Sequence, residues 1–341
     1  MKKDALPILA LVTAVFLFAL STSALAGTTF PKMTLKFGHS GQPTQNNAKG
    51  VVKFAELVKE RTGGAVEIQV YPAAQLGSDV AVQEQVKTGL VNFTFNGPSE
   101  LSSYKEWGPA AVLNMPYIIK GNTDREQYQN LRKLVHGPLM KEVNETAGRA
   151  TNLYMLDMAW WFGNLYLTTK TKRIVHPDDL NGLKIRTRDT PITRATIKAL
   201  GAVPVPMSVT EVYTALQMGV VEGEDNPPMV ILGYKFYEVQ KYLATTAHMT
   251  INQGVTTNYQ WFQGLQPELK DLMIKAAADA GEYMSDLQLK SLDSDMEKLK
   301  QLGVVITDVN KAEFAEKTKD SWKQFEPLFG KGFYEKVKAA Q

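Results

Sequence analysis

The alternation of strand and helix signals after residue 33 constrains the fold of this chain more than any other feature. Short segments that alternate apolar and polar residues, or are mainly apolar, predict β-strands. Longer segments with apolar residues at intervals of three and four predict helices. In chain order these are a strand at 34–37, a helix at 47–62, a strand at 66–70, a helix at 80–88 and a strand at 93–95. This β-α-β-α-β order predicts a mainly parallel sheet covered by helices.

The second half of the chain repeats this logic. A polar helical stretch at 123–146 and a long strand at 150–160 come first. They are followed by a strand at 183–186, a helix that opens at Thr190-Pro191, an extended segment at 203–206 and a helix with the capping box of Ser208 and Glu211. Residues 267–302 then form one long helix. Two α/β units and a long C-terminal helix predict a two-lobed α/β fold with a ligand cleft between the lobes.

Composition and charge exclude several classes of protein. The 341 residues are enough for two domains. With 44% hydrophobic and 21% charged residues, the chain has the composition of a folded protein rather than a disordered one. A net charge of +3, from 38 basic and 35 acidic residues, gives no case for a nucleic-acid partner. The absence of cysteine removes disulfides, thiolate metal sites and a cysteine nucleophile.

The first 26 residues have the three parts of a secretory signal peptide. Lys2 and Lys3 precede an uncharged run of 16 residues at 5–20, and the small-residue site Ala24-Leu25-Ala26 follows. This order predicts a signal peptide over residues 1–26 with cleavage after Ala26. The alternative, a permanent membrane anchor, needs about 20 apolar residues. We therefore expect an exported mature protein.

The sequence lacks the common motifs of catalysis and of tightly bound cofactors. It has no G-x-S-x-G, H-E-x-x-H, G-x-x-x-x-G-K or G-x-G-x-x-G segment. No two of the four histidines are three or four residues apart, so one helix cannot present a histidine pair to a metal. We expect a binding protein without cofactor or metal. The alternative is an exported enzyme that works through Glu211, Glu224 or Asp225.

Arg186 is the strongest candidate for a binding residue. Side chains alternate along a strand, so Lys184 and Arg186 share the face opposite Leu183 and Ile185. The helix that opens at Thr190-Pro191 has free backbone N–H groups, which favour an anion. Because arginine binds carboxylates through two parallel hydrogen bonds, we interpret Arg186 as a carboxylate clamp. The alternative is an ordinary surface salt bridge.

Two further features have both a structural and a functional interpretation. Trp160-Trp161-Phe162 ends the long predicted strand. Neighbouring aromatic residues on a strand point to opposite sides, so they either pack into two cores or line a ligand pocket. Asn226 stands in the segment Gly223-Glu224-Asp225-Asn226-Pro227, where its amide either stabilises a turn or binds a ligand oxygen.

Six motifs stand in order along the chain. They are Tyr71-Pro72-x-x-Gln75-Leu76-Gly77, Gly182-Leu183-Lys184-Ile185-Arg186, Ala199-Leu200-Gly201-Ala202, Pro206-Met207-Ser208-x-x-Glu211-Val212-Tyr213-Thr214-Ala215-Leu216-Gln217, Val221-Glu222-Gly223-Glu224-Asp225-Asn226-Pro227 and Lys235-Phe236-Tyr237-Glu238-Val239-Gln240-Lys241. This set resembles the solute-binding proteins of TRAP transporters, the DctP family. The resemblance runs from about residue 34 to about residue 310.

The resemblance implies a fold, a location and a set of partners. It implies two lobes joined by hinge strands, spanned by a long helix, that close over an organic acid in the periplasm. Lobe I is expected at 27–160 with 252–291, and lobe II at 161–251 with 292–341. The protein is expected to be a monomer that delivers its ligand to two integral-membrane permease subunits driven by an ion gradient. The alternative partner is a receptor kinase for which the chain serves as a periplasmic sensor subunit.

The resemblance also assigns ligand-binding residues. Arg186 matches the carboxylate-clamping arginine of the family, and Asn226 matches its cleft asparagine. Weaker matches and neighbouring residues complete the expected site: His39, Ser40, Phe95, Asn96, Trp160, Trp161, Tyr166, Asp189 and Val209.

Two departures from the family pattern bear on the ligand. Many members carry a second arginine about twenty residues before the clamp, but Gly163-Asn164-Leu165-Tyr166 has none. Acid-sugar binders place an acidic residue directly after the position of Asn96, where this chain has Gly97-Pro98. We therefore predict a monocarboxylate with an apolar or aromatic body, such as an α-keto or aryl-acetic acid. A C4-dicarboxylate or an acid sugar is the alternative, and it requires another cation such as Arg188 or His39.

Overall fold

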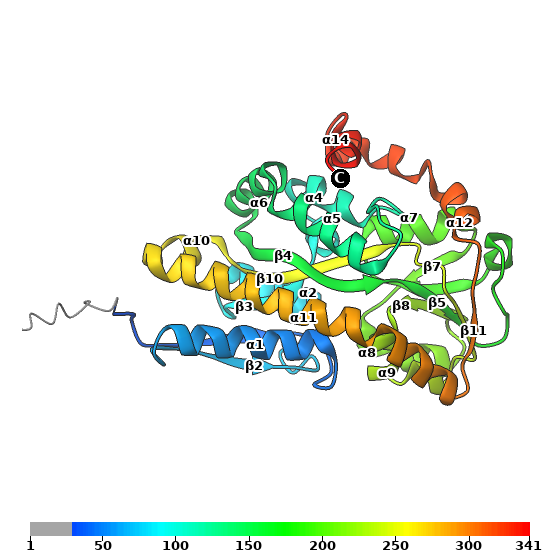
Figure 1. The fold of residues 1–341 in the computed structure, drawn as a ribbon, viewed down its shortest axis with the longest axis horizontal. Coiled ribbons are helices and arrows are strands. Elements are labelled where there is room, and N and C mark those ends of the chain that lie inside the picture. The colour runs from blue at the N-terminus through cyan, green and yellow to red at the C-terminus, as the bar shows by residue number, and fades with distance from the viewer. Residues whose placement is uncertain (1–28) are drawn as a thin grey trace, which may run out of the picture.

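The computed structural model describes residues 29–341 as two β-sheets that are covered by helices and joined by a long helix (Figure 1). The predicted signal peptide, residues 1–26, lies outside the described residues. In the described part of the chain, no helix is long and apolar enough to cross a membrane. The predicted two-lobed α/β architecture is confirmed, with one sheet in each lobe.

The first sheet has the strand order β2-β1-β3-β10-β4. β1 pairs in parallel with both β2 and β3, as the β-α-β-α-β order predicts. β10 returns from much later in the chain and pairs antiparallel with β3 and with β4. The bounds are Met33–Gly38 for β1, Val66–Tyr71 for β2, Phe93–Asn96 for β3, Leu153–Asn164 for β4 and Thr250–Asn258 for β10.

Helices cover both faces of the first sheet. On one face, Phe37 and Phe93 pack against Phe54 of α1, while Gly38 lies against Val82 of α2 on the other. The predicted helical stretch at 123–146 is two helices that meet at Gly137, because Pro138 cannot continue the first one. The helices of this lobe are α1 (Asn46–Arg61), α2 (Asp79–Thr88), α3 (Pro98–Leu101), η1 (Lys105–Trp107), α4 (Gly108–Ala111), η2 (Val112–Asn114), α5 (Asp124–His136), α6 (Pro138–Thr151) and α10 (Tyr259–Gln263).

The second sheet has the order β11-β9-β5-β8-β6-β7. β6 pairs in parallel with β7 and β8, whereas β5 is antiparallel to β8 and β9. Its strands are β5 (Tyr166–Thr169), β6 (Lys184–Thr187), β7 (Val203–Pro206), β8 (Gly223–Asn226), β9 (Tyr242–Ala244) and β11 (Val305–Thr307). Its helices are η3 (Pro177–Leu180), α7 (Pro191–Ala199), α8 (Val209–Gln217), α9 (Pro228–Gly233) and η4 (Phe236–Glu238), with α12 (Lys311–Thr318) packed on α7 and η3.

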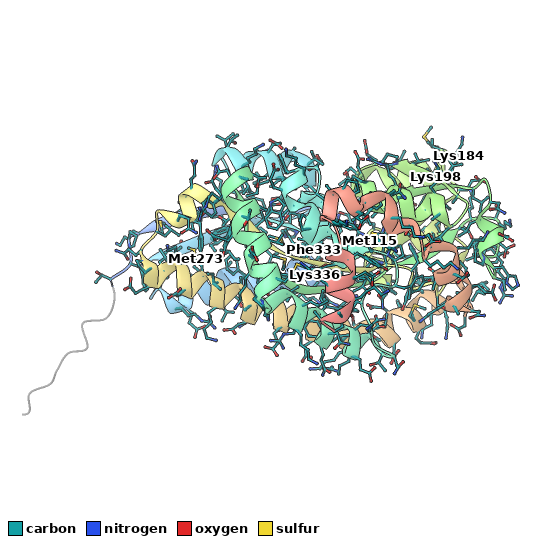
Figure 2. The ribbon with its side chains drawn as sticks, turned by 90° about the horizontal axis from the view of Figure 1, so that it is seen from above. Met115, Lys184, Lys198, Met273, Phe333 and Lys336 are labelled. Carbon is teal, nitrogen blue, oxygen red and sulfur yellow. The ribbon has the colours of Figure 1, made fainter. Side chains whose placement is uncertain are left out.

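The chain crosses between the lobes in adjacent segments. It leaves the first sheet between β4 and β5 and returns between β9 and β10, and the N–H of Leu165 donates to the carbonyl of Met249 at 2.9 Å where the crossings meet. The third crossing is α11 (Pro267–Gln301), which packs on α1 and β4 in the first lobe and on α9 in the second. Figure 2 shows the molecule from above, with Met273 of α11 at the first lobe and Lys184 and Lys198 at the second.

The C-terminal segment differs from the expected lobe boundaries. The expectation places residues 292–341 with the second lobe. After η5 (Ser321–Phe325), however, α13 (Glu326–Phe329) packs on α4 and α14 (Phe333–Ala339) packs on η2, both in the first lobe. The end of the chain therefore returns to the lobe in which the described part begins.

Candidate ligand-binding site

Arg186 lies at the end of β6 and is almost fully buried, with 3% of its surface exposed. Its Nε and Nη2 donate to the carbonyl of Met207 at 3.2 and 2.9 Å, which fixes the plane of the guanidinium. Its Nη1 is buried and has no partner among the described residues. Burial lowers the pKa of Arg186, and the charge of Asp225 opposes this effect. Arg186 therefore does not form the surface salt bridge that was the alternative interpretation.

Strand β8 places three buried polar residues beside Arg186. Glu224 accepts hydrogen bonds from Thr168 at 2.7 Å and from the amide of Asn226 at 2.5 Å. Burial raises the pKa of Glu224 to about 7. Asn226 is thus a buried strand residue whose amide is held by a carboxyl group, and not a solvated turn residue.

Asp225, between them, belongs to a separate buried cluster. Thr187 Oγ1 donates to its Oδ2 at 3.3 Å, and His248 Nε2 lies 3.5 Å from the same oxygen. The other ring nitrogen of His248 lies 2.9 Å from Thr246 Oγ1, in the segment that connects β9 to β10. This cluster links β6 and β8 to the segment between β9 and β10, in which the chain returns to the first lobe.

The first lobe contributes Ser40 and Asp79. Ser40 Oγ donates to Asp79 Oδ2 at 3.0 Å, and the carbonyl of Ser40 accepts from Tyr234 Oη of the second lobe at 2.6 Å. Burial raises the pKa of Asp79, which interacts electrostatically with Arg186, Arg188 and Glu100. Asp79 therefore shares the electrostatic environment of the clamp although it lies in the other lobe.

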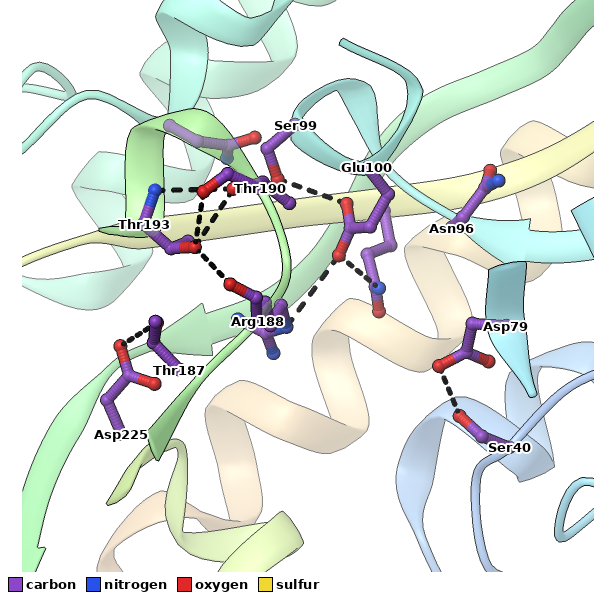
Figure 3. A network of polar contacts seen from close by, with 12 residues as sticks. Ser40, Asp79, Asn96, Ser99, Glu100, Thr187, Arg188, Thr190, Thr193 and Asp225 are labelled. Atoms are coloured by element: carbon purple, nitrogen blue, oxygen red, sulfur yellow. Dashed lines mark hydrogen bonds and ion pairs between the residues drawn. The ribbon is translucent and has the colours of Figure 1, made fainter. Parts of the chain in front are cut away.

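An ion pair that spans the lobes completes the cluster. Arg188 Nε lies 3.7 Å from Glu100 Oε1, and the Arg188 guanidinium lies over the ring of Phe162 at 5.2 Å. Figure 3 shows this pair together with Ser40–Asp79 and Thr187–Asp225. Arg188 stands two residues after Arg186, just beyond the end of β6, and the sequence indicates it only as an alternative cation for a dicarboxylate or an acid sugar. The sequence contains no signal for Glu100, whose partner is far away in the chain.

The predicted aromatic residues lie mainly in the packing of the lobes. Trp160 is fully buried against Gly50 of α1 and Gly281 of α11, and its ring lies 5.3 Å from that of Phe95. Trp161 points to the opposite face, where it contacts Tyr128 of α5. The two tryptophans therefore pack on opposite faces of the strand, as expected if they belong to two cores rather than to a ligand pocket.

The remaining predicted residues are dispersed. Tyr166 lies directly opposite Asn226 in the β5–β8 register, so the structure places it beside β8, the strand next to the one that carries Arg186. Asn96 donates to Gln83 at 2.8 Å and accepts from Thr256 at 2.5 Å. Asp189 is exposed and pairs with Arg194, and Val209 begins α8, partly buried.

His39 is buried and faces α1 rather than the clamp. Burial lowers its pKa to about 4, and neither ring nitrogen has a partner among the described residues. The residue lines a hollow of about 320 Å³ that also includes Lys49 and Tyr283. None of the residues that surround Arg186 lines this hollow.

Comparison with known proteins identifies the class to which this fold and cluster belong. Residues 37–328 match the DctP family, described as bacterial extracellular solute-binding protein, family 7. The chain therefore belongs to the DctP family, the solute-binding proteins of TRAP transporters. This is a family of binding proteins and not of enzymes, so the enzyme alternative is set aside.

Named relatives and solved structures cover nearly the whole chain. The C4-dicarboxylate-binding periplasmic protein DctP of Rhodobacter capsulatus is 31% identical over 84% of this chain and 81% of its own length. The 2,3-diketo-L-gulonate-binding periplasmic protein YiaO of Escherichia coli is 30% identical over 88% and 87%. A TRAP solute-binding protein from Ochrobacterium anthropi with bound L-fuconate superposes with a TM-score of 0.84 at 29% identity, covering 91% of this chain and 99% of that one. One from Actinobacillus succinogenes with bound L-galactonate has a TM-score of 0.83 at 28% identity, covering 90% and 99%.

Proposed function

We propose that this protein captures an organic acid by binding its carboxylate at Arg186 and closing its two lobes around it. The observation that carries the proposal is the buried Nη1 of Arg186, which has no partner among the described residues although the rest of the guanidinium is held by Met207. A buried donor without a partner is unfavourable, and a ligand carboxylate removes this cost through a charged hydrogen bond. Closure follows if the ligand contacts the closed state better than the open one.

The proposal also concerns the chemical nature of the ligand beyond its carboxylate. The sequence prediction of an apolar or aromatic body relied on Trp160, Trp161, Phe95, Tyr166 and Val209 together with the missing second arginine. The positions of the two tryptophans weaken that support, whereas Tyr166 beside Asn226 still agrees with it. An apolar monocarboxylate stays a prediction.

A hydroxylated monocarboxylate is the second candidate, and the polar side chains around the clamp favour it. Asp79, Glu100 and Arg188 place hydrogen-bonding groups near Arg186 from both lobes. The relatives solved with L-fuconate and L-galactonate carry ligands of this class. A ligand with several hydroxyl groups is the one that satisfies such groups without adding a second charge.

Calorimetric titration of the clamp variants tests the proposal. We expect Arg186→Ala to weaken binding of every acid that the native protein binds, by about 100-fold, because truncating one partner of a buried charged pair costs about 2–5 kcal/mol. Arg186→Lys should bind with intermediate affinity, since an ammonium group keeps the charge but not the bidentate geometry. The panel is phenylpyruvate, galactonate, succinate and sialic acid.

Arg194→Ala is the matched control, because Arg194 belongs to the same lobe and pairs with the exposed Asp189. It should leave the affinities unchanged. Thermal unfolding of each variant verifies that it is folded. An Arg186→Ala protein that is folded and binds its acid with native affinity contradicts the proposal.

We also infer that the protein is exported, with cleavage after Ala26, and that as a monomer it passes its ligand to two permease subunits in the membrane. The positive, apolar and small-residue segments at 1–26 support the export, and the named relatives DctP and YiaO are periplasmic. The intact mass of the secreted protein tests the cleavage site. A mass that retains residues 1–26 contradicts it.

A further inference from the structure

The Arg188–Glu100 pair joins the lobes beside the clamp. Arg188 follows β6 in the second lobe, and Glu100 lies in α3 of the first. Their side chains are only 12% and 18% exposed, with 3.7 Å between Nε and Oε1. This pair is therefore shielded from solvent, unlike the exposed pairs on the surface helices.

Both members of the pair are held in place by further contacts, Glu100 within its own lobe and Arg188 by residues of both lobes. Glu100 Oε2 accepts from Ser99 Oγ at 3.1 Å, and its Oε1 accepts from Gln253 Nε2 at 3.4 Å. The Arg188 guanidinium lies on Phe162, and its backbone carbonyl accepts from Thr193 Oγ1 at 2.7 Å. Figure 3 shows the contacts of Glu100 with Ser99 and of Arg188 with Thr193.

The pair offers hydrogen-bonding groups but little net charge. Arg188 Nη1 is buried and has no partner among the described residues, so it is free to donate. The Glu100 carboxylate is able to accept, and it neutralises the charge of Arg188. Of the two arginines Arg186 and Arg188, only Arg186 is not in an ion pair among the described residues.

Building on the proposed function, in which Arg186 binds the ligand carboxylate, we propose that the Arg188–Glu100 pair determines specificity by admitting a hydroxylated monocarboxylate and excluding the corresponding dicarboxylate. A ligand hydroxyl accepts from Arg188 and donates to Glu100. A second ligand carboxylate at the same place lies against the carboxylate of Glu100, and like charges juxtaposed in a binding site are strongly unfavourable. Asp79, which interacts electrostatically with both arginines, adds no cation.

The test uses two acids that differ only at one end. Galactonate ends in a hydroxymethyl group, and galactarate carries a second carboxylate there. We expect the native protein to bind galactonate at least tenfold more tightly than galactarate. Glu100→Gln removes the repelling charge and frees Arg188, so the preference for galactonate should fall at least fivefold. Arg188→Gln leaves Glu100 unneutralised, so the preference should rise.

The opposite directions of the two variants separate specificity from a structural role. Loss of a merely structural contact weakens both acids in both variants and leaves their ratio unchanged. Glu282→Gln is the control, since Glu282 pairs with Arg132 on the surface at 3.4 Å and should not change the ratio. Thermal unfolding verifies the fold, and if Glu100→Gln does not fold, the direction of Arg188→Gln decides.

Each other result overturns the proposal. A native protein that binds neither acid, or prefers galactonate by less than tenfold, lacks the predicted specificity. A folded Glu100→Gln protein whose preference falls by less than fivefold shows that the pair does not determine it. The Arg186→Ala variant distinguishes failure of the carboxylate clamp from failure of the specificity proposal. If it still binds galactonate with native affinity, the clamp itself fails, and if it loses binding while Glu100→Gln leaves the ratio unchanged, only the specificity proposal fails.

Discussion

Glu224 is a carboxyl group in the interior of the second sheet, and its protonation is coupled to the stability of the fold. It is fully buried, accepts hydrogen bonds from Thr168 and Asn226, and has its pKa raised to about 7 by burial. In the unfolded chain the same group titrates near its ordinary value of 4.5. Between these two values the folded protein retains a proton that the unfolded chain has lost, so stability falls as the pH rises through this window.

We expect Glu224→Gln to abolish this pH dependence. A glutamine at this position still accepts from Asn226 and is able to donate to Thr168, so the hydrogen bonds remain. The free energy of unfolding of the variant, relative to the native protein, should increase by about 3 kcal/mol between pH 4 and pH 8. Urea unfolding at unit pH intervals measures it, and the value at pH 4, where Glu224 is mainly protonated in both states, is the internal reference. A difference that stays constant with pH contradicts the coupling.

Single residues of the site could be predicted when their signal is local. Arg186 follows from strand alternation, from a neighbouring helix start and from motif order, whereas Asn226 follows from motif order alone, and the structure buries both on the adjacent strands β6 and β8. Glu100 could not be predicted, because its relation to Arg188 depends on how two lobes meet. The pair Trp160-Trp161 was likewise predictable only in part. Alternation predicts that they point in opposite directions, but not which neighbours cover them.

Elements with a strong period were predictable nearly to the residue. The helix expected at 47–62 is α1, Asn46–Arg61, and the one expected at 267–302 is α11, Pro267–Gln301. The helical stretch expected at 123–146 consists of α5 and α6, since Pro138 starts a second helix. β10 was not predicted. Its residues are buried at every position because helices or strands cover both faces, so the sequence shows no alternation there.

The packing of α11 on α1 depends on glycine at two positions. A side chain at Gly50 would lie 2.6 Å from Met284 Cβ, and one at Gly281 would lie 2.5 Å from the ring of Trp160. The absence of side chains there lets Trp160 fit between the two helices. Because α11 continues into the second lobe, this contact also sets the position of the helix that connects the lobes.

On the scale of the whole molecule, the number of lobes was predictable and the path of the chain end was not. Two α/β units in sequence imply two sheets. The resemblance to the DctP family implies the hinge strands and the long helix that connect them. Residues 311–339 form short amphipathic helices whose pattern predicts burial of one face without naming the lobe that covers it. The structure shows that α12 packs on the second lobe while α13 and α14 pack on the first. The C-terminal segment is thus one more connection between the lobes.

Closure of the lobes is visible in a hydrogen bond that has no part in ligand chemistry. Tyr234 Oη, at the end of α9, donates to the carbonyl of Ser40 in the first lobe at 2.6 Å, and Gln45 Nε2 donates to Met229 nearby at 3.4 Å. Burial raises the pKa of Tyr234 to about 12, so the phenol keeps its proton at any ordinary pH. These bonds exist only when the lobes are together, and they therefore favour the closed state.

Tyr234→Phe should weaken the binding of galactonate and galactarate by the same factor. Loss of one hydrogen bond costs about 0.5–1.5 kcal/mol, which is a factor of about 2–10 in the population of the closed state and hence in every affinity that requires it. The preference between the two acids should stay constant, in contrast to Glu100→Gln. Titration calorimetry measures the affinities, and small-angle scattering of the unliganded protein should give a larger radius of gyration. Tyr213→Phe, which loses a bond to Glu238 within the second lobe, should alter neither. A changed preference, or unchanged affinities, would show that Tyr234 does not act through closure.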